Sequence, residues 1–133
     1  MAKFIQIYLV VLAAFLVIDM IWLGLVAKKF YREQLGSLMR AGVNWPAAVI
    51  FYLLFIVGLV FFVVYPAVEQ GSWFYALWTG AFFGLICYAT YDLTNLATLK
   101  NWPLKLTIVD LIWGSVLSGV LGIIGFLYGR TIL

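Results

Sequence analysis

The chain has 133 residues, 67% of them apolar and 10% charged, whereas about a quarter of the residues of a soluble domain carry charge. This composition excludes a water-soluble globular protein. The 8 Lys and Arg against 5 Asp and Glu are too few and too scattered for a nucleic-acid surface, so we expect no nucleic-acid partner. The absence of histidine excludes Ser-His-Asp and Cys-His nucleophiles, histidine zinc sites and axial histidine haem ligation. We expect neither a cofactor nor a bound metal.

Four apolar runs are long enough to cross a bilayer, whose hydrocarbon core of about 30 Å needs roughly 20 residues of helix. We therefore predict an all-α integral membrane four-helix bundle that forms a single transmembrane domain over residues 1–133. The helices are expected at about 4–27, 45–65, 73–99 and 103–128.

The first connection, 28–41, is basic and differs in character from the runs around it. Tyr31, Leu35 and Leu38 follow the i, i+4, i+7 spacing of a short interfacial amphipathic helix. The alternative is an irregular basic loop, because Gly36 weakens a helix. Four side chains of this segment are expected to hold anionic lipid: Lys28, Lys29, Arg32 and Arg40.

The later helices carry distinct signals. Pro66 is expected to end the second helix at Tyr65. The last third of the third helix is too polar to face lipid, so it must face protein, water or ligand. In the fourth helix Gly114, Ser118 and Gly122 recur every four residues and favour close helix packing. That packing lies either inside the bundle or at the seam of a homodimer.

The tripeptide Asn-Trp-Pro occurs twice, at 44–46 and at 101–103. Each copy is expected to supply a capping Asn, an interfacial Trp and a helix-starting Pro. When the basic segment is left out, Asp19 and Asp92 align relative to the two copies. The pattern indicates a duplicated helical hairpin, or else a shared local way of starting a helix at the membrane surface.

Basic residues near the helix ends gather on one side of the membrane. The 1–2 and 3–4 connections carry Lys28, Lys29, Arg32, Arg40, Lys100 and Lys105, and the opposite side carries Lys3 and Arg130. By the positive-inside rule the connections face the cytoplasm and both termini lie outside. Trp45 and Trp102 would then mark the cytoplasmic boundary.

Three acidic residues lie within the predicted helices. At about 1.5 Å per residue, Asp19 lies roughly 12 Å from the cytoplasmic end of its helix, and Asp92 and Asp110 about 10 Å from theirs. An ionised carboxylate in hydrocarbon costs at least ~2.5–3.5 kcal/mol, so these acids must face inward, pair, take up a proton or bind a cation. Their helical neighbours complete the predicted solute- or ion-binding site, which consists of Asp19, Trp22, Tyr88, Asp92, Asn95, Thr107, Asp110 and Trp113. In the structural alternative, the aspartates pair with Lys28, Lys100 or Lys105 and fasten the bundle.

Three sequence stretches carry a resemblance to a known family. They are YATYDLTNLATLKNWP at 88–103, DLIWG at 110–114 and DMIWLG at 19–24. Over nearly the whole chain the sequence resembles a family of small bacterial inner-membrane proteins described as a domain of unknown function. The resemblance implies a short multi-pass protein of the bacterial inner membrane and no particular reaction or catalytic residue.

Three functions are compatible with this pattern, and no motif decides whether the chain is an enzyme. The favoured one is binding or transport of a small hydrophobic or cationic solute, coupled to a proton or cation at the aspartates. Its plan is similar to that of small multidrug-resistance transporters, whose own motifs are absent and whose membrane acid is Glu. The second is an accessory or lipid-binding role. The third is a lipid or isoprenoid enzyme in which Asp92, Asn95 and Asp110 bind Mg²⁺, although no D-x-x-x-D pair is present.

Overall fold

The fold is described by a computed structural model, which covers residues 1–39 and 42–133. Four helical segments are long and apolar enough to cross a membrane: Ala2–Leu38, Trp45–Gln70, Trp73–Thr98 and Leu104–Ile132. No strand occurs among the described residues, so the predicted all-α class is confirmed. Arg40 of the expected lipid-binding set and the end of the predicted 28–41 segment lie outside the described residues.

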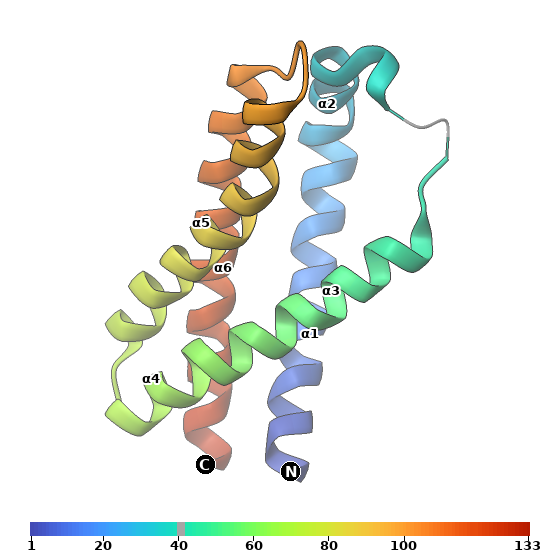
Figure 1. Cartoon of the computed structure of the whole chain (residues 1–133). Coiled ribbons are helices and arrows are strands. Elements are labelled where there is room, and N and C mark those ends of the chain that lie inside the picture. Colours follow the sequence, from blue (N-terminus) through green and yellow to red (C-terminus); the bar gives the residue numbers. More distant parts are fainter. Residues whose placement is uncertain (40–41) are drawn as a thin grey trace.

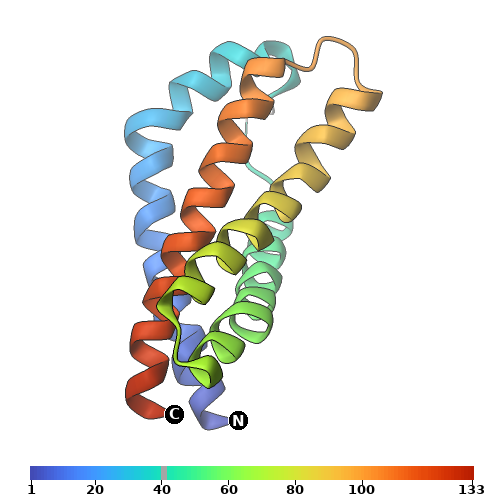
Figure 2. The same cartoon turned by 90° about the vertical axis from the view of Figure 1, so that its left-hand side faces the viewer.

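The first segment turns where the membrane-crossing part meets the basic part. Helix α1 (Ala2–Trp22) continues through a π-helical turn, η1 (Leu23–Ala27), into α2 (Lys28–Leu35) and a 3₁₀ turn, η2 (Gly36–Leu38). Figure 2 shows the chain bending at the end of α1, so that α2 runs across the end of the bundle. A helix therefore forms over Lys28–Leu35, and the irregular-loop alternative is wrong there. Tyr31 and Leu35 are half-buried, whereas Leu38 is exposed.

The second segment is longer than predicted. The Asn44 side chain accepts a hydrogen bond from the Ala47 N–H and caps α3 (Trp45–Leu59). The π-helical turn η3 (Val60–Val64) follows, and α4 (Tyr65–Gln70) continues beyond Pro66. The prediction that Pro66 ends the helix is wrong, because the change to wider π-type bonding places the proline in the first turn of α4. Gly71, in the left-handed conformation, ends the segment instead.

Helices α5 (Trp73–Thr98) and α6 (Leu104–Ile132) pack against each other along most of their length. Small residues permit the close approach: a Cβ added to Gly84 would overlap the Gly114 carbonyl oxygen and the Ser118 side chain. A Cβ on Gly122 would lie 2.7 Å from the Ala76 carbonyl oxygen. The small-residue face of α6 is therefore used inside the chain. Because α5 occupies it, this face is not available as the alternative homodimer seam.

The two Asn-Trp-Pro copies adopt different structures. Asn101 has a positive φ of 62° and does not cap α6, whose N-cap is Pro103 without a side-chain bond. Trp102 is 8% exposed and donates from Nε1 to Thr107 Oγ1, whereas Trp45 is 55% exposed. The predicted capping role of Asn101 is therefore wrong, and Trp102 packs inside the protein where Trp45 is exposed. The tripeptides do not provide structural support for a duplicated hairpin.

Helix α3 crosses the bundle at a slant, whereas α5 and α6 run side by side (Figure 1). The buried core joins α1, α3, η3 and α6 through apolar side chains: Ile7, Val11, Phe15, Phe55, Ile56, Leu59, Val60, Val63, Val64, Leu117 and Leu121. Both termini lie at one end of the bundle, and α2 and the α5–α6 connection lie at the other (Figure 1). Toward the α2 end the slanted α3 diverges from α5, and the candidate site lies there.

Candidate functional site

Each membrane aspartate belongs to the inward-facing stripe of its helix. Buried residues recur every four positions along α1, as Ile7, Val11, Phe15 and Asp19, and along α5, as Ala76, Gly80, Gly84 and Asp92, with half-buried Tyr88 between the last two. In α6, Asp110 precedes buried Gly114 by the same spacing. Because residues four apart share one face of a helix, packing the small and apolar members inward also turns the acids inward.

Asp92 and Asp110 form the centre of the site. Asp92 is 0% exposed, and within residues 1–39 and 42–133 neither of its carboxylate oxygens has a hydrogen-bond partner. The Asp110 side chain lies within hydrogen-bonding reach, so a proton on either acid would allow one carboxyl group to donate to the other. Asp110 is 7% exposed and accepts a hydrogen bond from the Tyr31 hydroxyl at 2.7 Å. The two helices α5 and α6 thus bring two acids together in a buried site.

Tyr31 links this acid pair to α2. Its hydroxyl donates to Asp110 and in turn accepts from Trp22 Nε1 at 3.4 Å, so side chains of α1, α2 and α6 form one hydrogen-bonded chain. Our sequence interpretation assigned Tyr31 to the apolar face of an interfacial helix and missed its role at the acids. The available signal was the hydroxyl itself, since a tyrosine on the inner face of a surface helix needs a polar partner.

Asp19 occupies a separate place beside the pair. It is 7% exposed, and the Trp113 side chain lies within hydrogen-bonding reach of its carboxylate. Trp113 stacks on Trp22, with ring centroids 4.2 Å apart and planes 7° from parallel. In the described part of the chain no group of three or more acidic, Cys or His residues is placed to hold a metal ion. The structure therefore brings two of the three acids together and gives the third its own donor.

Of the remaining predicted site residues, Tyr88 belongs to the site, whereas Thr107 and Asn95 do not line its cavities. Tyr88 lies beside the acids, contacts Gly114 and packs edge-on against Phe55 at 6.5 Å between centroids. Thr107 is buried but is engaged by Trp102 and by the Pro103 carbonyl at 3.2 Å, so it fastens the start of α6. Asn95 is half-buried on α5 and lines neither of the cavities beside the acids.

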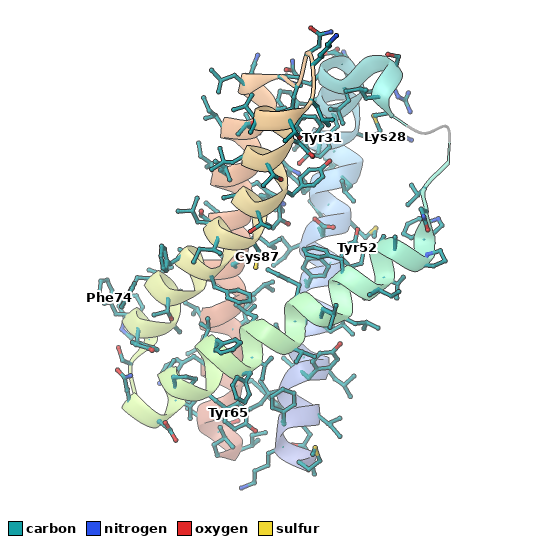
Figure 3. The ribbon with its side chains drawn as sticks, in the orientation of Figure 1. Lys28, Tyr31, Tyr52, Tyr65, Phe74 and Cys87 are labelled. Carbon is teal, nitrogen blue, oxygen red and sulfur yellow. The ribbon has the colours of Figure 1, made fainter. Side chains whose placement is uncertain are left out.

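Two cavities meet at Asp110. The larger, of about 470 Å³, lies between α3, α5 and α6 and is lined by Ala48, Phe51, Tyr52, Cys87, Tyr88, Tyr91 and Asp110. Figure 3 shows Tyr52 on α3 and Cys87 on α5 on opposite sides of this space. The smaller, of about 240 Å³, lies beneath α2 and is lined by Tyr31, Leu35, Met39, Tyr91, Asp92, Leu106 and Asp110. Aromatic rings surround the larger space, and the two acids meet at the smaller one.

No basic side chain pairs with the acids in the part of the chain that the structure describes. Across residues 1–39 and 42–133 the single ion pair joins Lys29 and Glu33 at 4.0 Å, and both side chains are exposed. The pairing of the aspartates with Lys28, Lys100 or Lys105, which the structural alternative required, is not found there. The lysine side chains at this end are exposed, and Lys105 instead lies over the Phe30 ring at 6.0 Å. Negative charge at the pair must be neutralised by a proton or by a ligand.

Comparison with known proteins identifies a family to which the chain belongs. Residues 4–127 match a family described as "Predicted membrane protein (DUF2177)", which confirms the resemblance seen in the sequence. No curated protein and no solved structure matches the chain significantly.

Proposed function

Since the chain belongs to the DUF2177 family of predicted membrane proteins, we propose that it binds a small organic cation within the membrane, in exchange for a proton or metal cation, and carries it across. The observation that carries this proposal is the larger cavity, which combines four aromatic side chains with one carboxylate, Asp110. Aromatic rings attract a cation through their negative faces, and the carboxylate supplies the counter-charge.

The geometry of the cavity supports a cationic solute more than a neutral or anionic one. Its lining within the described residues contains one acid and no base, and its other side chains are mainly aromatic. A neutral apolar solute would leave the negative charge of Asp110 without a counter-charge, and that charge would repel an anion. A hydrophobic cation satisfies both the rings and Asp110. The size of the cavity points the same way: a space of about 470 Å³ fits an organic cation, whereas a bare metal ion would leave it largely unfilled.

Removing the carboxylate of Asp110 is expected to weaken binding of ethidium, an aromatic cation, by at least about tenfold, because the buried counter-charge is lost. Fluorescence anisotropy of ethidium titrated with the purified protein in detergent measures this. Asp110→Asn keeps an oxygen that can accept from Tyr31, so the fold is retained and the charge alone changes.

Glu33→Gln is the matched control, because it removes one negative charge from an exposed position. It should leave ethidium affinity unchanged. If wild-type protein shows no saturable binding, or if Asp110→Asn binds as tightly as wild type, the proposal is wrong. Uptake of ethidium into proteoliposomes with an imposed proton or sodium gradient then separates transport from binding alone.

We further propose that the protein lies in the bacterial inner membrane with the α2 end in the cytoplasm. Three exposed basic residues of α2, Lys28, Lys29 and Arg32, support contact with anionic lipid headgroups, at about 1 kcal/mol each near the surface. Both termini lie at the other end and would then be outside. Alkaline phosphatase fused after Leu133 is expected to be active, and a cytoplasm-dependent reporter at the same place to be inactive. The reverse pattern would overturn this orientation.

A further inference from the structure

We propose that the ion exchanged at this site is a proton, which Asp92 and Asp110 share and which enters and leaves through the smaller cavity beneath α2. This inference rests on the proposed function, from which it takes the organic cation as solute. The identity of the exchanged ion is argued from separate observations. Those observations are the unpartnered, fully buried carboxylate of Asp92, its neighbour Asp110 and the second cavity.

The carboxyl pair is built to hold one proton. With both acids ionised, two negative charges would face each other in a buried site, and both Asp92 oxygens would lack a donor among the described residues. One proton removes one charge and supplies the missing donor, because a carboxylic acid can donate to the neighbouring carboxylate. Tyr31 already donates to Asp110, which favours keeping the remaining negative charge there.

The described groups that face the pair carry no positive charge. They are Tyr31 from α2, Tyr91 from the same helix as Asp92, and Asp19 and Tyr88 on the side of Asp110. Every one of these is acidic or neutral. A hard metal ion takes about six oxygen ligands, whereas the pair provides two carboxyl groups beside a tyrosine hydroxyl whose proton is already committed.

The two cavities give the two acids different roles in the proposed exchange. Asp110 lines both spaces, whereas Asp92 lines the smaller one alone. An organic cation in the larger cavity would therefore meet Asp110, and the proton would be released from Asp92 toward α2. In that step the O–H bond of the shared acid breaks and the proton passes to water. The acid pair and its ligand carry one net negative charge before and after the exchange.

Proton release is the first test of this inference. Adding ethidium to wild-type protein in weakly buffered detergent is expected to release about one proton per ethidium bound, measured with a pH-indicator dye. Asp92→Asn should still bind ethidium through Asp110 but release no proton. The affinity of the wild-type protein for ethidium should rise with pH, whereas that of Asp92→Asn should not depend on pH. Glu33→Gln should behave as wild type. Undiminished release by Asp92→Asn, or competition by Na⁺ without proton release, would overturn the proposal.

Infrared spectroscopy tests the shared proton without any solute. The wild-type protein should show the carbonyl stretch of a protonated carboxylic acid in a buried site, and Asp92→Asn should lack it while Glu33→Gln retains it. If ethidium does not bind, the proposed function fails and this band alone decides whether the pair holds a proton. If ethidium binds and the band is absent from wild type, the function stands and the proton inference falls.

Discussion

Replacing Gly84 by alanine is expected to lower the free energy of unfolding by about 2–3 kcal/mol, the upper range for overpacking a well-packed interior. The added methyl group would overlap the Gly114 carbonyl oxygen and the Ser118 side chain, so α5 and α6 would have to separate. Apolar burial gives little drive for association inside a lipid bilayer, which makes this close contact a main source of cohesion. Reversible unfolding in mixed micelles, followed by circular dichroism, measures the loss.

Gly24→Ala provides the matched control, because a Cβ at that position meets no atom within 4 Å. Its stability should stay within about 0.5 kcal/mol of wild type, as for most substitutions away from packed sites. Equal stability of the two alanine variants would contradict the role assigned to the α5–α6 contact.

Replacing Asp92 by leucine is expected to raise the free energy of unfolding by about 2 kcal/mol, because burying a carboxyl pair in hydrocarbon is costly even when the pair shares a proton. The side chain of Asp92 is 0% exposed, Asp110 is the one described side chain within hydrogen-bonding reach of it, and the adjoining cavity of about 240 Å³ has space for the larger leucine side chain. The same variant should lose ethidium-driven proton release. A gain in stability accompanied by a loss of exchange is typical of a residue retained for function. Unfolding in mixed micelles again provides the measurement.

Asp110→Leu is the informative partner of this variant. It removes the acceptor of the Tyr31 hydroxyl, and a buried donor left unsatisfied costs about 1–3 kcal/mol, so stability should fall. A loss of stability in Asp92→Leu as well would mean that the proton shared with Asp110 makes the pair a net source of stability, and the cost assigned here to burying Asp92 would be wrong.

Much of the site was predictable because helical spacing is local. Asp19, Asp92 and Asp110 could be placed at a common depth and on inward faces from residue counting alone, and the structure buries all three. Counting could not tell which acids would be neighbours. Asp92 lies against Asp110, whereas Asp19 lies within hydrogen-bonding reach of Trp113, because these neighbours depend on how α1, α5 and α6 are rotated against one another.

The sequence prediction failed where an interaction outside the local sequence pattern changed the outcome. Pro66 normally ends a helix, but the π-helical turn before it shifts the bonding so that the helix continues. Trp102 follows the pattern of an interfacial tryptophan, yet it is buried because Thr107 offers an acceptor one turn into α6. In each case the outcome depends on an interaction that the local pattern does not contain.

The membrane class, the four apolar helices and the basic end follow from the sequence by itself, because apolar run length and charge decide what a bilayer accepts. Tertiary structure alone decided that Tyr31 of α2 reaches Asp110, that α3 slants away from α5 and that an aromatic cavity opens between them. The physical reason is that residue spacing sets the face a side chain occupies on its own helix. The neighbour that meets this face is set by the fit of small and large residues between helices.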